Sequence, residues 1–157
     1  MVYAGRLLAR REYAVAELEL RLLRKWAGAD RIAERVAGLI AGLQADGSLS
    51  DSRFAESFTR SRRNRYHGPI KIRAELRQRA VPDAIVEETL RPMEGEWVPL
   101  AASWLAQQCN GPLDFEARAK YYRRLMSRGF SHQQAMEALA STPTPGSSGI
   151  VNQSVLR

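Results

Sequence analysis

The sequence has few of the residues that carry covalent and metal chemistry. It contains one cysteine, Cys109, which excludes an internal disulfide, and two histidines, His67 and His132. Neither histidine has a serine or cysteine partner at the spacing of a catalytic motif, and the sequence contains no P-loop and no metal-ligand cluster. We therefore expect a binding protein without enzymatic activity, cofactor or metal.

Long hydrophobic runs are also lacking. Residues 1–20 alternate basic, acidic and apolar residues without the continuous apolar core of a signal peptide, and no later segment approaches the length of a membrane span. Together with the single cysteine, which suits a reducing compartment, this pattern predicts a cytoplasmic protein that makes no membrane contact.

Apolar residues recur at spacings of three and four along most of the chain, which is the period of amphipathic helices. No strand-like alternation of useful length is present, so the sequence predicts an all-α protein. Three signals mark helix starts: Asp51 is a candidate N-cap, Pro69 suits a first helical position, and Ser131–Gln134 has the pattern of a capping box.

An internal repeat organises these helices. Residues 75–90 align with residues 124–139 without a gap, and residues 22–36 match more loosely. Repeats of roughly 50 residues made of three helices are typical of helical solenoids, in which neighbouring units bury a shared core. We predict three tandem three-helix units in an elongated, curved helical-repeat array, with the last unit truncated. The predicted units are about 6–66, 67–110 and 111–141.

The chain is thus expected to form a single domain over residues 1–141. From Thr142 onward the sequence is rich in threonine, proline, glycine and serine and has no apolar period. This composition predicts a disordered tail over residues 142–157.

Charge is strongly unbalanced. The formal net charge is +7 and the pI about 10.2, which favours polyanions as partners. Residues 60–79 contain eight basic residues and one acid, Glu75, so this segment accounts for the whole net charge. A weaker basic cluster surrounds Tyr121. The candidate contacts for DNA or an acidic protein surface are Arg60, Arg62, Arg63, Arg65, Lys71, Arg73, Arg77, Arg79, Lys120, Arg123 and Arg124.

A structural explanation of this charge stays open. Charge runs are most often solvated helix faces, although an inert face usually mixes both signs. Arg62, Arg63 and Arg65 also close a predicted helix, where cations interact favourably with the helix dipole without any ligand. By helical spacing, Trp97 and Trp104 are predicted to be core residues that do not stack on bases.

The central block of the sequence, residues 47–55 (Gly-Ser-Leu-Ser-Asp-Ser-Arg-Phe-Ala) followed by Gly68-Pro69 with Ile72, Glu75 and Leu76, resembles the RecX family of bacterial regulators of the RecA recombinase. Matching residues on the flanks extend the resemblance over about residues 6–140. The resemblance implies a three-unit helical protein that lies along the RecA–DNA filament and restrains ATP hydrolysis, strand exchange and co-protease activity.

This sequence departs from the family pattern at two turns. Trp26 precedes Ala27-Gly28 where the family usually has glycine, and Ala80 replaces the same glycine in the second unit. A left-handed helix end costs Ala or Trp free energy that it does not cost Gly. We therefore expect these two turns to be built differently from the family pattern, and the first unit to be the one most affected.

The leading hypothesis is a non-enzymatic, monomeric modulator that contacts RecA protein and single- and double-stranded DNA without reading base sequence. The first alternative is a helix-turn-helix transcriptional regulator, whose candidate recognition helix after Gly129 offers His132, Gln133 and Gln134. A protein scaffold is the second alternative, but it leaves the net charge of +7 unexplained.

Overall fold

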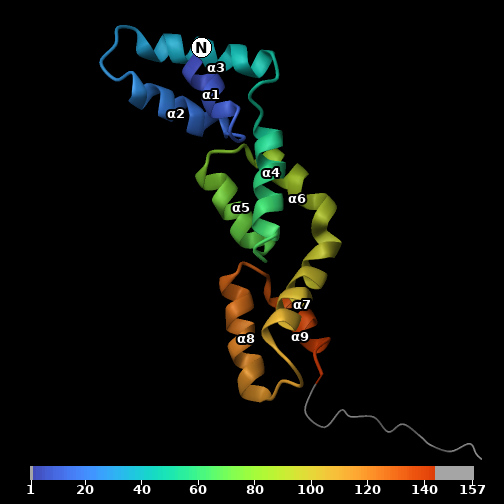
Figure 1. Ribbon diagram of the computed structural model, residues 1–157. Helices are drawn as coiled ribbons and strands as arrows, with labels where there is room; N and C mark the ends of the chain where they lie inside the picture. Colours follow the sequence, from blue (N-terminus) through green and yellow to red (C-terminus); the bar gives the residue numbers. More distant parts are fainter. Residues whose placement is uncertain (1, 144–157) are drawn as a thin grey trace, which may run out of the picture.

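A computed structural model of the chain describes residues 2–143 and is helical throughout, with no strand in that range, which confirms the all-α prediction (Figure 1). The elements are α1 (Val2–Leu8), α2 (Val15–Lys25), α3 (Ile32–Ala45), α4 (Asp51–Arg63), α5 (Pro69–Gln78), α6 (Asp83–Leu90), a 3-10 helix (Arg91–Glu96), α7 (Trp97–Gln108), α8 (Phe115–Ser127) and α9 (His132–Ala140).

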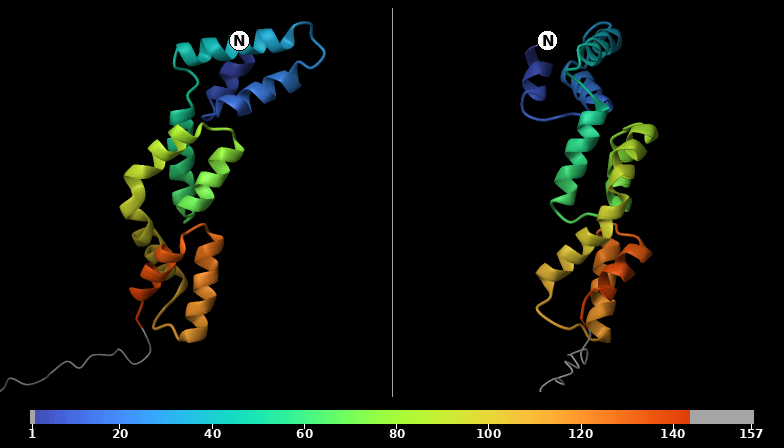
Figure 2. Two further views of the ribbon diagram at one scale, coloured as in Figure 1. Left: turned by 180° about the vertical axis from the view of Figure 1, so that it is seen from behind. Right: turned by 90° about the vertical axis from the view of Figure 1, so that its right-hand side faces the viewer.

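Three hydrophobic clusters hold the helices together in groups of three, which we call units 1, 2 and 3, and Trp97 at the start of α7 joins the cluster of the group before it. Unit 1 comprises α1–α3, unit 2 comprises α4–α6, and unit 3 comprises α7–α9. The units follow one another along a long axis (Figures 1 and 2). Helices α4, α5 and α8 run roughly along this axis, whereas α3 lies across it, so the elongated array bends at its N-terminal end.

The boundaries of the units differ from the ranges predicted from the sequence. The aligned segments 75–90 and 124–139 are confirmed as equivalent pairs, α5–α6 and α8–α9, each with the same tight turn. However, each pair packs on the helix before it: Phe54 of α4 belongs to the cluster of unit 2, and Trp104 of α7 belongs to that of unit 3. Apolar periodicity identifies a helix but not the neighbour on which it packs. Unit 3 is therefore complete.

Sequence patterns placed most helix starts correctly. Pro69 is the first residue of α5, and Ser131 and Gln134 form the predicted capping box of α9. The N-cap of α4 is Ser50, however, and Asp51 is the first helical residue. An Asp51 carboxylate oxygen instead accepts the backbone N–H of Val15 at 2.9 Å, so a residue of unit 2 caps α2 of unit 1.

The two turns that depart from the family pattern behave differently. Ala80 has a φ of 55° and Gly129, its equivalent in unit 3, has a φ of 90°, so the second unit keeps the left-handed turn despite lacking glycine. In unit 1 the residue after α2, Trp26, has a φ of −114°, and the left-handed position falls at Gly28. Only the first turn is therefore rebuilt.

Units 2 and 3 join through the backbone. The N–H of Gly68 donates to the carbonyl of Arg128 at 2.8 Å, and the N–H of Ile70 donates to the carbonyl of Gly129 at 3.0 Å. The end of α8 thus satisfies N–H groups at the start of α5 that have no partner within their own helix. We call this contact the unit 2–3 junction.

The first two residues of the predicted tail are bonded to unit 3. The carbonyl of Thr142 accepts from the Arg118 guanidinium at 2.8 Å, and the carbonyl of Pro143 accepts from the N–H of Leu113 at 3.0 Å. The rest of the predicted tail, residues 144–157, lies outside the described residues. None of the described helices is both long and apolar enough to cross a bilayer.

Candidate nucleic-acid and protein interface

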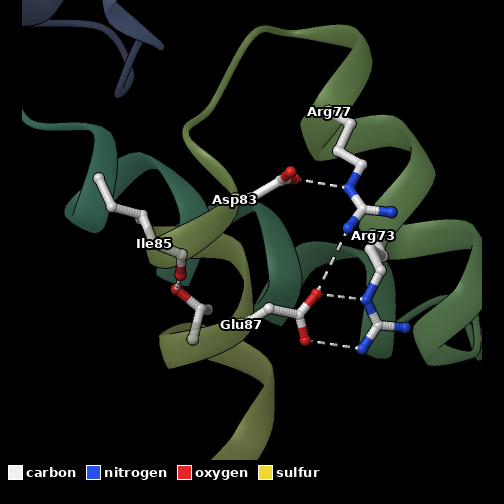
Figure 3. Close-up of polar contacts among 6 residues, drawn as sticks. Arg73, Arg77, Asp83, Ile85 and Glu87 are labelled. Atoms are coloured by element: carbon white, nitrogen blue, oxygen red, sulfur yellow. Dashed lines mark hydrogen bonds and ion pairs between the residues drawn. The ribbon is translucent and has the colours of Figure 1, made fainter.

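Two arginines of the basic segment face carboxylates of the next helix. Arg73 of α5 makes a two-pronged contact with Glu87 of α6, at 2.7 and 3.1 Å, and Arg77 lies 2.7 Å from Asp83 and 3.7 Å from Glu87 (Figure 3). Hydrogen bonding to Glu87 raises the pKa of Arg73, and the same bond lowers the pKa of Glu87. These four side chains neutralise one another on the surface of unit 2.

Three more arginines of the segment are also engaged within the fold. Arg62 lies 2.5 Å from Glu75, and Arg63 pairs with Glu96 of the 3-10 helix. Arg79 donates to the carbonyl of Glu75 at 3.0 Å, and its guanidinium lies 4.6 Å from the centre of the Phe58 ring. The hypothesis that these side chains stabilise the protein therefore has direct structural support.

The excess of positive charge in residues 60–79 is smaller in the folded protein than in the linear sequence. Within the segment Glu75 is the single acid, but folding brings Asp83, Glu87 and Glu96 onto it from the following helices. The pair Arg73–Glu87 spans fourteen residues and crosses a turn, so helix-face spacing alone does not predict it.

Seven of the eleven candidate residues form no ion pair with any residue between 2 and 143. One of them, Arg79, is held by the carbonyl of Glu75. The other six are Arg60, Arg65, Lys71, Lys120, Arg123 and Arg124. Arg60 lies on α4, Arg65 and Lys71 lie on either side of the start of α5, and the other three lie on α8. Helices α5 and α8 follow one another on the same side of the array (Figures 1 and 2). The uncompensated charge therefore spans units 2 and 3.

Aromatic side chains near these cations belong mainly to the core. Trp97 and Trp104 are 2% and 4% exposed, which confirms their predicted core positions. Tyr121 packs edge-on against Trp104, with ring centres 6.1 Å apart, and its hydroxyl donates to the carbonyl of Gln108 at 3.1 Å. Tyr121 is thus used for packing, and its ring lies 5.9 Å from the charged groups of Lys120 and Arg124.

A pocket of about 350 Å³ lies at the unit 2–3 junction. Its walls come from the start of α5, the end of α7 and the end of α8, and its lining contains no carboxylate. The lining residues are His67, Lys71, Trp104, Gln108, Arg124, Ser127 and Arg128. From the sequence, Arg128 belongs to the weaker basic cluster but is not among the candidate contacts, and the role of His67 stays open, because only the packing of one unit on the next brings the two together.

Among residues 2–143 no group of three or more histidine, cysteine, aspartate or glutamate side chains is arranged to hold a metal ion. The charged surface, not a closed pocket with acid–base groups, is the main chemical feature of the molecule. Fold and surface together define a class of protein: a tandem three-helix-repeat protein with a basic face.

Comparison with known proteins identifies the family. Residues 50–90 match the family model "RecX, second three-helix domain", which coincides with α4–α6. Regulatory protein RecX of Chromohalobacter salexigens is 44% identical over 138 residues, covering 87% of this chain and 88% of the relative. Regulatory protein RecX of Halorhodospira halophila is 36% identical over 140 residues, covering 88% and 84%. The chain belongs to the RecX family of regulatory proteins.

A solved structure agrees with the fold. The crystal structure of RecX from Lactobacillus salivarius superposes with a TM-score of 0.73 at 22% sequence identity, covering 88% of this chain and 90% of that one. At this level of identity the likeness concerns the fold alone: it supports three three-helix units in tandem.

Proposed function

We propose that this protein binds the RecA nucleoprotein filament and restrains RecA's ATP hydrolysis, strand exchange and co-protease activity, and thereby regulates DNA repair and recombination. Membership of the RecX family carries the proposal, because the family resemblance implies a regulator of RecA. The protein acts in the cytoplasm as a monomer, by occupying a surface and without catalysing a reaction.

The shape of the molecule supports this function. An elongated array of units presents an extended surface, which suits a filament better than a small globular partner. Arg60, Arg65 and Lys71 of unit 2 and the cations of α8 in unit 3 supply unpaired positive charge along it. Such contacts fix position on phosphates or acidic side chains without reading base sequence.

The transcription-factor alternative receives little support from α9. His132 is hydrogen-bonded to the hydroxyl of Tyr122 at 2.9 Å, Gln133 donates to Glu137 at 2.8 Å, and the Gln134 side chain accepts from the N–H of Ser131 at 2.8 Å. The polar groups required for reading bases are thus occupied within the unit. The basic surface lies on other helices, which favours a binder of filaments over a reader of sequence.

Co-sedimentation tests the proposal directly. The protein is mixed with RecA on single-stranded DNA, with RecA alone and with DNA alone, and the pellets are compared; RecA's DNA-dependent ATP hydrolysis is measured in parallel. We expect the protein to pellet with the filament and to slow hydrolysis. Binding of the protein to neither filament nor DNA at low salt would favour a scaffold, and a shift specific to one duplex sequence would favour a transcriptional regulator.

A further inference from the structure

The pocket at the unit 2–3 junction gathers positive charge that nothing in its lining neutralises. Lys71 comes from α5, Arg124 from α8, and Arg128 from the turn after α8. Lys71 and Arg124 form no ion pair within residues 2–143. Arg62, Arg63, Arg73 and Arg77 of unit 2 are each matched by a carboxylate, whereas no carboxylate lines this pocket, so its charge is available to an anionic ligand.

Arg128 is fixed in place without being neutralised. Its guanidinium donates to the carbonyl of Arg65 at 2.8 Å and lies 4.6 Å from the centre of the Trp104 ring. Both partners are uncharged, so the positive charge stays available to an anion. Burial, and after it the charge of Arg124, lowers the pKa of Arg128, which is the response of a cation that lacks a counter-charge.

His67 lies in the same positively charged environment. Burial, and after it the charge of Lys71, lowers the pKa of His67, and its Nδ1 atom is buried without a hydrogen-bond partner among the described residues. An anion near His67 would raise the pKa of the ring, because it would favour the protonated form, and it would give Nδ1 a hydrogen-bond partner. The side chain therefore also provides a probe of what enters the pocket.

The cations continue beyond the pocket in a row. Lys120, Arg124 and Arg128 are spaced by four residues along α8 and its end, so they succeed one another on one face at intervals of about 6 Å along the helix axis. An evenly spaced row suits a polyanion whose charges repeat, whereas a single acidic side chain would satisfy only one position. The volume of about 350 Å³ holds on the order of ten water molecules, which leaves ample room for a phosphate group.

We propose that the junction pocket binds a phosphate group of a nucleic-acid backbone, with Lys71 and Arg124 as the contacting cations, Arg128 as a fixed charge behind them, and Lys120 on the next phosphate along the strand. The site exists only where two units stack, since Lys71 and Arg124 belong to different units. The proposal rests on the proposed function, of which it specifies the DNA contact.

Fluorescence anisotropy with labelled oligothymidylate tests the site in the full-length chain. The variant Lys71→Gln with Arg124→Gln is compared with the control Arg10→Gln with Arg24→Gln, which removes the same charge from exposed positions of unit 1 that form no ion pair among the described residues. Affinity is measured over a range of salt concentrations. Circular dichroism and urea unfolding confirm that both variants fold.

Loss of two phosphate contacts should flatten the slope of log affinity against log salt by about 1.4, because each contact on a single strand contributes roughly 0.7. The control should change the slope by less than half as much. An unchanged slope in the pocket variant overturns the proposal. If that unchanged slope accompanies weaker binding to the RecA filament, the pocket contacts an acidic protein group instead.

Two further measurements separate the possible sources and the two proposals. Inorganic phosphate is titrated while the His67 resonances are followed by NMR; a shift of these resonances together with an unchanged DNA slope in the pocket variant would assign the site to a free anion and overturn the backbone assignment. Inhibition of RecA's ATP hydrolysis by the wild-type protein is measured separately. If the pocket variant flattens the DNA slope but the wild-type protein does not affect RecA, the proposed function fails and the phosphate site stands.

Discussion

Gly68 and Gly129 face each other across the unit 2–3 junction so closely that neither tolerates a side chain. A Cβ atom on Gly68 would lie 2.4 Å from the carbonyl carbon of Gly129, and one on Gly129 would lie 2.3 Å from the Cβ of Lys71. Both contacts are with backbone or with the first side-chain carbon, which rotamer changes do not relieve. The relative position of α5 and α8, and with it the junction pocket, therefore depends on these two glycines.

Replacing Gly129 with alanine should destabilise the protein by about 2–5 kcal/mol. The φ of 90° is unfavourable for alanine, at about 1–2 kcal/mol, and displacing Lys71 adds an overpacking cost of about 1–3 kcal/mol. Urea unfolding followed by circular dichroism measures the change. Gly38→Ala is the matched control: it lies within α3 with nothing inside 4 Å of the new Cβ, and should be neutral or stabilising by about 0.5–1 kcal/mol. Equal effects at both sites would contradict the close contact.

Replacing Ala80 with glycine should stabilise the protein. Ala80 holds a φ of 55° at an exposed position, a strain of about 1–2 kcal/mol that glycine removes. Glycine also increases the entropy of the unfolded chain, which offsets about 0.4–1 kcal/mol, so we expect a net gain of about 0.5–1 kcal/mol. Ala74→Gly, an exposed site within α5, should instead lose about 1 kcal/mol. Thermal and urea unfolding measure the change in stability for each variant. A loss of stability at both positions would mean that the turn accommodates Ala80 without strain.

The Arg73–Glu87 pair should stabilise the fold in a pH-dependent way. Hydrogen bonding to Arg73 lowers the pKa of Glu87 in the folded state, so its contribution is fully present above the unfolded pKa of about 4.3 and is lost as the pH falls through the folded value. Because the pair is partly exposed, the coupling should be only about 0.5–1 kcal/mol.

A double-mutant cycle with Arg73→Met and Glu87→Gln measures this coupling by urea unfolding at about pH 7 and at about pH 3. The coupling energy should be positive at neutral pH and smaller in acid, where more of the Glu87 carboxylate is protonated. An equal coupling at both pH values would show that packing of the two side chains, and not their charges, holds α5 to α6.

Local sequence patterns predicted most of the helices, and particular residues show which features these patterns could not predict. The capping box at Ser131 and the proline at the start of α5 are short-range signals, and both predictions were correct. The short α1 was not predicted, although Ala4 and Leu7 are buried, because a helix of seven residues shows too little of the period. Its place in unit 1 depends on packing, as does the role of Asp51 in capping α2.

At the candidate site, too, the sequence could not predict which charged residues contact one another. The sequence located the basic residues, but it could not show that Arg63 meets Glu96 across thirty-three positions or that Lys71 meets Arg124 at a junction between units. Ion pairs between helices follow from topology, and topology is a property of the whole chain. The surface that remains for a partner is found only after the internal pairs are known.

The final prediction compares two sets of four cations that carry equal charge. One set is paired within the fold: Arg62, Arg63, Arg73 and Arg77. The other forms no ion pair within residues 2–143 and does not line the junction pocket: Arg60, Arg65, Lys120 and Arg123. Each set is changed to glutamine in the full-length chain, which lowers the net charge by the same amount, so long-range electrostatics alone would affect both variants equally.

We expect the two variants to fail in different ways. The paired set should lose about 1–3 kcal/mol of unfolding free energy, since each partly exposed pair contributes about 0.2–1 kcal/mol. The unpaired set should keep its stability within about 0.5 kcal/mol per site but should flatten the salt dependence of single-stranded DNA binding by up to about three, from roughly 0.7 per contact. Urea unfolding measures the stability, and anisotropy with oligothymidylate measures the salt dependence of DNA binding. Inhibition of RecA's ATP hydrolysis by each variant shows the effect on function. The opposite pattern, with the paired set dominating DNA binding, would mean that the internal ion pairs open when the partner arrives and that Glu87, Asp83 and Glu96 compete with phosphate for the same arginines.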